Sequence, residues 1–170
     1  MSDRLIKPGV LLSGVNLPSW PAGAMMNLGS WRGPRAFLTV HSAGCKGCRK
    51  YIGEDLTSAA ERLTEWGGHL VVVVPGQVEN AKGLAEIVPN VMQVLTDYEG
   101  EVATGTAKVV IADQWGEVYF VKDSGATHDL PTLSEIAEWI RFLAIQCPEC
   151  EGPEGGWRTV SLESPCRQLG

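Results

Sequence analysis

The chain has 170 residues, of which 44% are hydrophobic and 20% are charged, and its formal net charge is −6. This composition is typical of a folded globular protein, and the length suits one domain with an extension or two. Nucleic acids and anionic membranes are bound by clustered basic surfaces, so the acidic balance indicates that neither is the main partner. The one local basic cluster consists of Lys46, Arg49 and Lys50.

Residues 1–34 are rich in glycine and proline and predict an N-terminal extension of loops, with a hairpin near GAMMNLGSW. Their apolar runs are too short for a signal peptide or a membrane span, so a cytoplasmic location is expected. Disulfide frameworks are rare in that compartment. Paired cysteines are therefore expected to be redox-active or metal-binding.

The next elements alternate between strand and helix patterns. RAFLTVH at residues 35–41 predicts a buried strand, and apolar residues then recur at helical spacing from Ile52 to Trp66. Gly67 and Gly68 end that helix, and HLVVVV at residues 69–74 predicts a central strand.

The second half continues with a weaker helix at about residues 79–87 and a strand at 91–95. AKVVIADQWGEVYFVKD, at residues 107–123, predicts a β-hairpin. A capping-box pattern of Thr132 and Glu135 then starts the last helix. This order predicts an α/β domain over residues 35–146, with a mixed sheet and helices on both faces, followed by a flexible tail at 147–170.

Two cysteines, Cys45 and Cys48, lie in TVHSAGCKGCRKY, between the expected strand and the expected helix. They could be a redox couple, half of a metal site or two inert thiols. The positive end of a helix stabilises a thiolate at Cys45, and Lys46 and Arg49 are expected to act in the same direction. Cys48, one helical turn later, is placed to attack a mixed disulfide at Cys45. The placement favours the redox couple.

The chain resembles the thioredoxin-like superfamily, and more closely its redoxin branch, which includes peroxiredoxin-like proteins. The resemblance covers about residues 14–145 and is carried by LPSWPAGAMMNLGSWRGPRAFLTVH, CKGC and GTAKVVIADQWGEV. It implies a thioredoxin-like fold with an N-terminal redoxin extension. It also implies that Cys45 is the nucleophile and Cys48 the resolving cysteine.

Some positions of the chain depart from the family patterns and others match them. Where thioredoxins have a tryptophan before the first cysteine and a cis-proline beside the dithiol, this chain has Gly44 and Ala107. A cis bond before a non-proline residue costs about 2.5–4 kcal/mol, so a trans bond is expected before Ala107. Ser42 matches a peroxide-binding position of peroxiredoxins, and Lys108 stands in place of their arginine. His41 is a candidate proton acceptor for the first cysteine.

His128 and Asp129 could form a catalytic dyad, but adjacent side chains seldom point the same way. A loop before Pro131 is therefore the preferred interpretation of this segment.

Three further cysteines follow the last helix. Cys147 and Cys150, in QCPEC, could form a second redox couple, half of an intersubunit zinc site or a tail feature without chemistry. A helix of this length carries the chain roughly 20 Å from the first pair, which argues against one zinc site shared by both pairs. Cys166 could shuttle electrons to Cys45 along an extended segment.

Three functions follow, in order of preference. The first is a thiol-disulfide oxidoreductase that uses Cys45 and Cys48 on a protein disulfide. The second is a peroxiredoxin-like thiol peroxidase that reduces peroxides through Cys45. Both need a thiol-based electron donor, and no cofactor is expected. The third is a non-enzymatic binding module with a zinc site in the tail.

Overall fold

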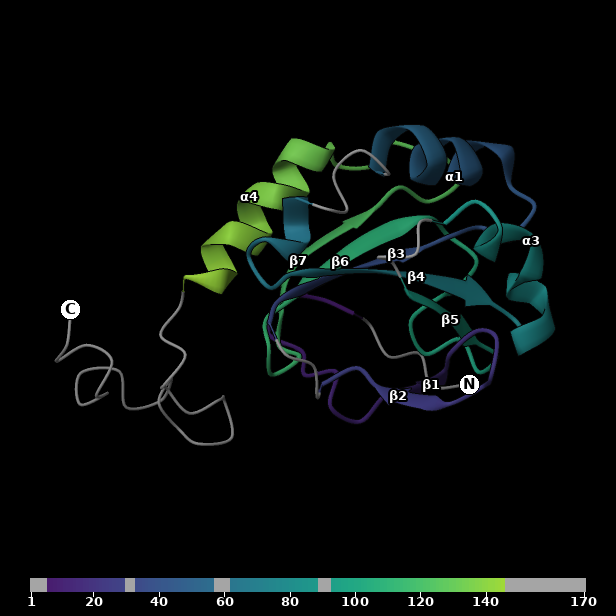
Figure 1. Cartoon of the computed structure of the whole chain (residues 1–170), viewed down its shortest axis with the longest axis horizontal. Helices are drawn as coiled ribbons and strands as arrows, with labels where there is room; N and C mark the ends of the chain where they lie inside the picture. Colours follow the sequence, from purple (N-terminus) through teal and green to yellow (C-terminus); the bar gives the residue numbers. More distant parts are fainter. Residues whose placement is uncertain (1–5, 30–32, 57–61, 89–92, 146–170) are drawn as a thin grey trace, which may run out of the picture.

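The computed structural model describes residues 6–29, 33–56, 62–88 and 93–145, and these form two β-sheets with helices (Figure 1). The small antiparallel sheet pairs β1 (Asn16–Pro18) with β2 (Met25–Asn27), where the hairpin was expected. The large sheet has the order β5-β4-β3-β6-β7. Its strands are β3 (Arg35–Thr39), β4 (His69–Pro75), β5 (Gln93–Asp97), β6 (Lys108–Ala112) and β7 (Val118–Asp123).

The large sheet is mixed, as the sequence predicts. Strands β3, β4 and β5 are parallel, whereas β6 is antiparallel to both β3 and β7. Parallel neighbours need a crossover, and helices occupy both crossovers. Helix α1 (Lys46–Lys50) continues as the π-helix η1 (Tyr51–Leu56) between β3 and β4, and the 3₁₀ helix η2 (Val78–Ala81) and α3 (Lys82–Ala85) lie between β4 and β5. Helix α4 (Leu133–Ala144) follows β7.

The expectation of helices on both faces is wrong for the described residues. Helices α1 and α4 lie on one side of the large sheet, and the β1–β2 hairpin lies on the other (Figure 1). The helix side buries alternate strand residues together with the helices, including Leu38, Val40, Val72, Ile52, Leu84, Ile136 and Ile140. The opposite side buries the remaining strand residues against the N-terminal segment, including Phe37, Val71, Val73, Leu12, Val15, Leu17 and Leu28. Alternating apolar residues require a cover on each face, and here residues 6–29 supply the second one.

Arg35, at the start of β3, ties that N-terminal segment to the sheet. Its fully buried guanidinium donates to the carbonyls of Leu28, Gly33 and Gln114, at 3.0, 2.8 and 3.0 Å. Burial lowers the pKa of Arg35 to about 9, and the charge of Asp113 partly offsets this. Arg35 therefore stays charged at neutral pH and holds three chain segments together.

The capping box of the last helix is confirmed. The backbone N–H of Glu135 donates to Thr132 Oγ1 at 3.2 Å, and the N–H of Thr132 donates to Glu135 Oε2 at 2.7 Å. The helix buries Ile136, Ile140 and Leu143 against the sheet. The cap thus fixes where α4 begins, directly after the loop that follows β7.

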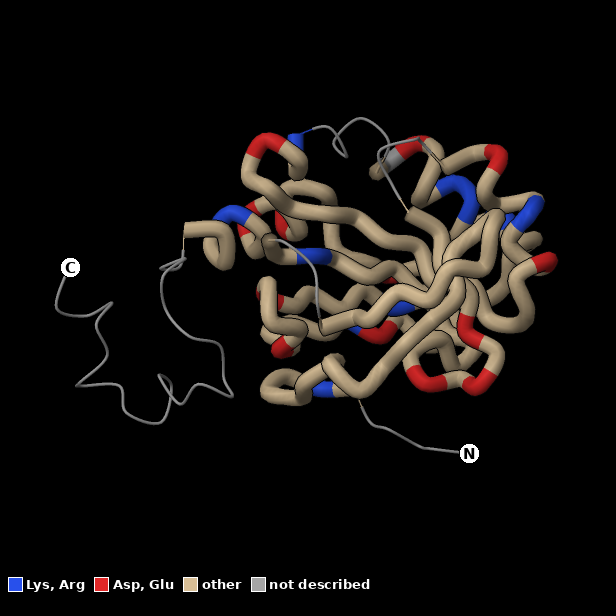
Figure 2. Tube along the Cα trace, turned by 60° about the horizontal axis from the view of Figure 1, so that its bottom comes forward, with Lys and Arg blue, Asp and Glu red and all other residues tan. Residues whose placement is uncertain are grey.

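Figure 2 shows basic and acidic residues interspersed along the described chain. Within this part of the protein, no helix has both the length and the apolar character needed to cross a bilayer.

Asp97 organises the loop after β5. Its side chain is buried and accepts four backbone N–H groups, from Gly100 and Glu101 at Oδ1 and from Val102 and Ala103 at Oδ2, over 2.7–3.1 Å. Asp97 therefore stabilises the turn after β5. The loop in turn places Val102 and Ala103 in the core on the face opposite the helices.

Replacing Asp97 with alanine should destabilise the protein by about 3 kcal/mol, because four backbone N–H groups, two of them buried, lose a carboxylate acceptor. Asp97→Asn keeps one acceptor oxygen and should cost less. The free energy of unfolding in urea measures both changes. Asp129→Ala is the control, since Asp129 is exposed and pairs with Lys122 at 3.2 Å. Equal stabilities of Asp97→Ala and the control would contradict the role of Asp97.

Candidate active site

Cys45 and Cys48 lie at the strand-to-helix junction that the sequence predicts. Cys45 is the N-cap of α1 and has an extended backbone, with φ −64° and ψ 117°. Cys48 follows in the first turn and is only 1% exposed, whereas Cys45 is half-buried. Both are free thiols. One sulfur can therefore meet a substrate while the other lies beneath it.

Two histidines contact both sulfurs. His41, directly after β3, has Nδ1 at 3.8 Å from Cys45 Sγ and at 3.4 Å from Cys48 Sγ. His128, in the loop between β7 and α4, has Nε2 at 3.3 Å from Cys45 Sγ and at 3.6 Å from Cys48 Sγ. The two rings are 4.9 Å apart and nearly edge-on. The dithiol is thus enclosed by imidazoles from segments that lie far apart in the sequence.

The tautomer of His41 follows from its second ring nitrogen. Nε2 lies 2.6 Å from the carbonyl oxygen of Gly125, and a carbonyl can only accept a hydrogen bond. Nε2 therefore carries the proton, and in the neutral ring the lone pair of Nδ1 faces the sulfurs. The Gly125 carbonyl raises the pKa of His41; burial opposes this, and Cys45 adds to it.

Gly47, inside the CKGC motif, makes room for His128. A Cβ atom at this position would lie 2.4 Å from Cε1 and 2.5 Å from Nε2 of the His128 ring, closer than such atoms can approach. The glycine therefore lets the imidazole lie over the first turn of α1. This is a packing reason for a glycine between the two cysteines.

The two thiols differ strongly in acidity. Partial burial raises the pKa of Cys45, but the backbone N–H of Cys48 and the side chains of His128, Cys48 and His41 together lower it to about 6. Burial raises the pKa of Cys48 to about 11, against the lowering effect of the His41 N–H, and proximity to Cys45 adds to the rise. At neutral pH the first cysteine is thus mostly thiolate and the second is a thiol.

The basic residues beside the motif have other partners or lie exposed. Arg49 donates to the carbonyls of Ala43 and Gly83, at 3.3 and 3.0 Å, and Lys46 is exposed. The helix turn and the two histidines, rather than Lys46 or Arg49, account for the acidity of the first cysteine.

Other candidates from the sequence lie as follows. Ser42 is exposed, and its carbonyl accepts the N–H of Cys45 at 3.2 Å. Ala107 is fully buried, and its peptide bond is trans, because Trp20–Pro21 is the one cis bond among the described residues. Lys108 is buried, with Nζ at 3.4 Å from Thr104 Oγ1 and 3.9 Å from Asp123. Cys147, Cys150 and Cys166 lie outside the described residues.

His128 is the site residue that the sequence analysis set aside. The reason given there, that it and Asp129 point differently, agrees with the structure, since Asp129 pairs with Lys122. The loop after β7 folds back over α1 and so brings His128 to the dithiol, a path that the neighbouring residues in the sequence do not indicate. Tyr51 Oη anchors this loop by donating to the carbonyl of Pro131 at 2.6 Å.

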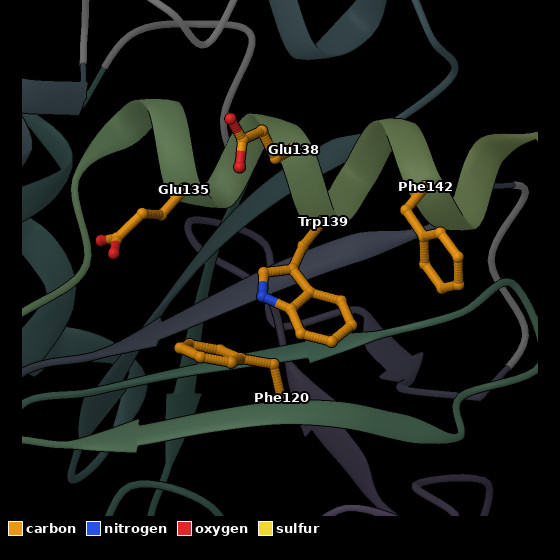
Figure 3. Close-up of a pocket in the computed structure, with 5 residues that line it drawn as sticks. All are labelled: Phe120, Glu135, Glu138, Trp139 and Phe142. Atoms are coloured by element: carbon orange, nitrogen blue, oxygen red, sulfur yellow. The ribbon is translucent and has the colours of Figure 1, made fainter.

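A separate hollow of about 420 Å³ lies between α4 and β7 (Figure 3). It is lined by Phe120, Glu135, Glu138, Trp139 and Phe142, and the ring of Trp139 points between the helix and the strand. These five residues include no cysteine or histidine, so the hollow is distinct from the dithiol site.

The fold is similar to that of solved peroxiredoxins and peroxiredoxin-like proteins, as the sequence resemblance implies. Peroxidoxin BcpB from Mycobacterium tuberculosis superposes with a TM-score of 0.67 at 19% identity, over 82% of this chain and 99% of that one. Reduced Prx3 from Vibrio vulnificus, in complex with hydrogen peroxide, gives a TM-score of 0.65 at 14% identity, over 80% and 96% of the chains. A putative protein disulfide isomerase from Bacteroides thetaiotaomicron gives 0.60 at 13% identity, over 82% and 91%. No family model and no curated protein sequence matches the chain.

The rate at which Cys45 is alkylated by iodoacetamide should rise with pH around a midpoint near 6, because the thiolate is the reacting species. His128→Ala removes a contact that lowers this pKa and should move the midpoint upward. Mass spectrometry of the labelled peptide measures both curves from about pH 4 to about pH 10. This range covers the expected midpoint and the ordinary thiol pKa. A midpoint near the ordinary value of 9 in the unaltered protein would contradict the site description.

Proposed function

We propose that the chain is a thiol-disulfide oxidoreductase in which Cys45 is the nucleophile and Cys48 the resolving cysteine. The observation that carries this proposal is the opposite character of the two sulfurs, one accessible with a pKa near 6 and one buried with a pKa near 11. A low-pKa thiolate attacks and leaves readily, and a buried thiol held beside it reacts only after the first bond has formed.

The reaction proceeds in two exchanges. The Cys45 thiolate attacks one sulfur of a substrate disulfide, the substrate S–S bond breaks, and the second substrate sulfur leaves as a thiolate that takes a proton. Cys48 then loses its proton and attacks Cys45 Sγ, so the mixed disulfide breaks and the first substrate sulfur leaves. The neutral imidazole of His41, with Nδ1 at 3.4 Å from Cys48 Sγ, is the base that accepts this proton. A thiol-based donor then reduces the Cys45–Cys48 disulfide.

Peroxide is the second candidate substrate, and the structural neighbours of the chain favour it. They include a peroxidoxin, a Prx3 with hydrogen peroxide and a thiol peroxidase from Chromobacterium violaceum. In this reaction the Cys45 thiolate attacks one peroxide oxygen and becomes a sulfenic acid, and the other oxygen leaves as water or an alcohol. Attack by Cys48 on Cys45 Sγ then releases water and forms the same disulfide.

Two substrates tested in parallel separate the candidates. Reduced protein is mixed either with an oxidised protein disulfide or with hydrogen peroxide, and the loss of free thiol is followed over time. Cys45→Ser should abolish both reactions, and Cys48→Ser should trap a mixed disulfide of defined mass with the protein substrate. Faster reaction with the disulfide supports the oxidoreductase, and rapid oxidation by peroxide selects the peroxidase.

The control for this experiment is a variant with Cys147, Cys150 and Cys166 all changed to serine. It should react as the unaltered chain does if the first pair carries the chemistry. Activity that persists in Cys45→Ser and is lost in the triple variant would overturn the proposal.

A further inference from the structure

The two sulfurs and two imidazole nitrogens of the site form a compact cluster of metal-ligand type. Sγ of Cys45 and Cys48 and one ring nitrogen each of His41 and His128 all lie within 4.8 Å of one another. We propose that the reduced protein binds one zinc ion here, with these four side chains as ligands. The inference goes beyond the proposed function and stands without it, because it concerns binding and not turnover.

The spacing of the four atoms suits a tetrahedral ion. Zinc lies about 2.3 Å from thiolate sulfur and about 2.0–2.1 Å from imidazole nitrogen, so sulfur and nitrogen on a tetrahedral ion are about 3.6 Å apart. The four sulfur-to-nitrogen distances here are 3.3, 3.4, 3.6 and 3.8 Å. These four distances lie within about 0.3 Å of the tetrahedral value, and the sulfur-to-sulfur and nitrogen-to-nitrogen distances do not exceed 4.8 Å.

The hydrogen bond of His41 has the form found behind metal-bound histidines. A ligating imidazole usually donates its other N–H to a carboxylate or a backbone carbonyl, which fixes both the tautomer and the ring orientation. Here Nε2 of His41 donates to the Gly125 carbonyl at 2.6 Å, and Nδ1 faces the two sulfurs. This second observation, made on a different atom from those that would bind the ion, independently supports a metal ligand.

The donor set selects the class of ion. Two thiolates and two imidazoles in a tetrahedral arrangement are typical of zinc, while magnesium and calcium prefer oxygen ligands. Two thiolate charges also neutralise a divalent cation. Cys48 is buried at the base of the cluster and His128 is exposed, so the ion has a route in from the His128 side.

Metal binding should be measured on the full-length chain, reduced and stripped of metal. Zinc is titrated against a chromophoric chelator, and cobalt is added separately because tetrahedral thiolate coordination gives it a distinctive visible spectrum. One zinc per chain should bind, with loss in Cys45→Ser and retention in the triple serine variant of Cys147, Cys150 and Cys166. Zinc that is retained in Cys45→Ser and lost in the triple variant would place the metal in the tail and overturn the proposal.

Two matched pairs test the histidine ligands. His128→Ala should weaken zinc binding by about 10- to 100-fold, and His69→Ala, at the opposite end of the sheet, should leave it unchanged. Gly47→Ala should also weaken binding, because the new methyl group displaces the His128 ring; Gly53→Ala, where a Cβ meets nothing within 4 Å, should not. Circular dichroism of each variant checks folding.

The results that overturn the proposal differ from those that overturn the redox function. The four-ligand site is rejected if the chain binds no zinc when one equivalent is added. It is also rejected if both His128→Ala and Gly47→Ala leave the affinity for zinc unchanged, even when thiol exchange is normal. Conversely, a chain without thiol-exchange activity that binds zinc in this pattern supports the metal site and rejects the oxidoreductase.

Discussion

The end of β3 is the constraint on which the site depends. This strand is paired on both sides, with β4 and β6, and all five of its residues are buried, so its end is held in a defined place. His41 and Cys45 follow within a few residues, and α1 begins directly after Cys45. The rigid sheet thus sets the position from which the first sulfur faces both the helix amides and the two imidazoles.

Two chemically identical side chains have opposite acidities at this site. The sulfurs share the same histidine neighbours, yet one pKa falls to about 6 and the other rises to about 11. Desolvation penalises the charged form of both, but only Cys45, at the N-cap, gains enough from the helix turn and the imidazoles to overcome it. Cys48 instead packs into the core on the helix side of the sheet. A three-residue displacement along the chain is sufficient to separate a partly exposed thiol of low pKa from a buried thiol of high pKa.

Local patterns in the sequence predicted most of the fold, whereas contacts between distant segments did not follow from them. The strand-to-helix junction at Cys45, the hairpin at residues 107–123 and the cap at Thr132 rest on neighbouring residues, and all are present. The cover of the second sheet face was assigned wrongly, because alternation shows that a face is apolar but not which segment packs on it. His128 was not predicted as a site residue because it also depends on a contact between distant segments. It lies 80 residues after Cys48 and reaches the dithiol only through the path of the loop after β7.

A Cys-x-x-Cys motif alone leaves redox and metal chemistry open, and both proposals made above draw on the histidines that contact the two sulfurs. Each requires the sulfur of Cys45, so zinc and a disulfide substrate would compete for one atom. A ligand that binds only the native state stabilises it in proportion to the logarithm of its concentration over Kd. Zinc would therefore stabilise the reduced form, in which both thiols are free, and not the disulfide, which has no thiolate to offer. The balance between the two chemistries would then depend on zinc supply and redox poise, with the same four side chains serving each.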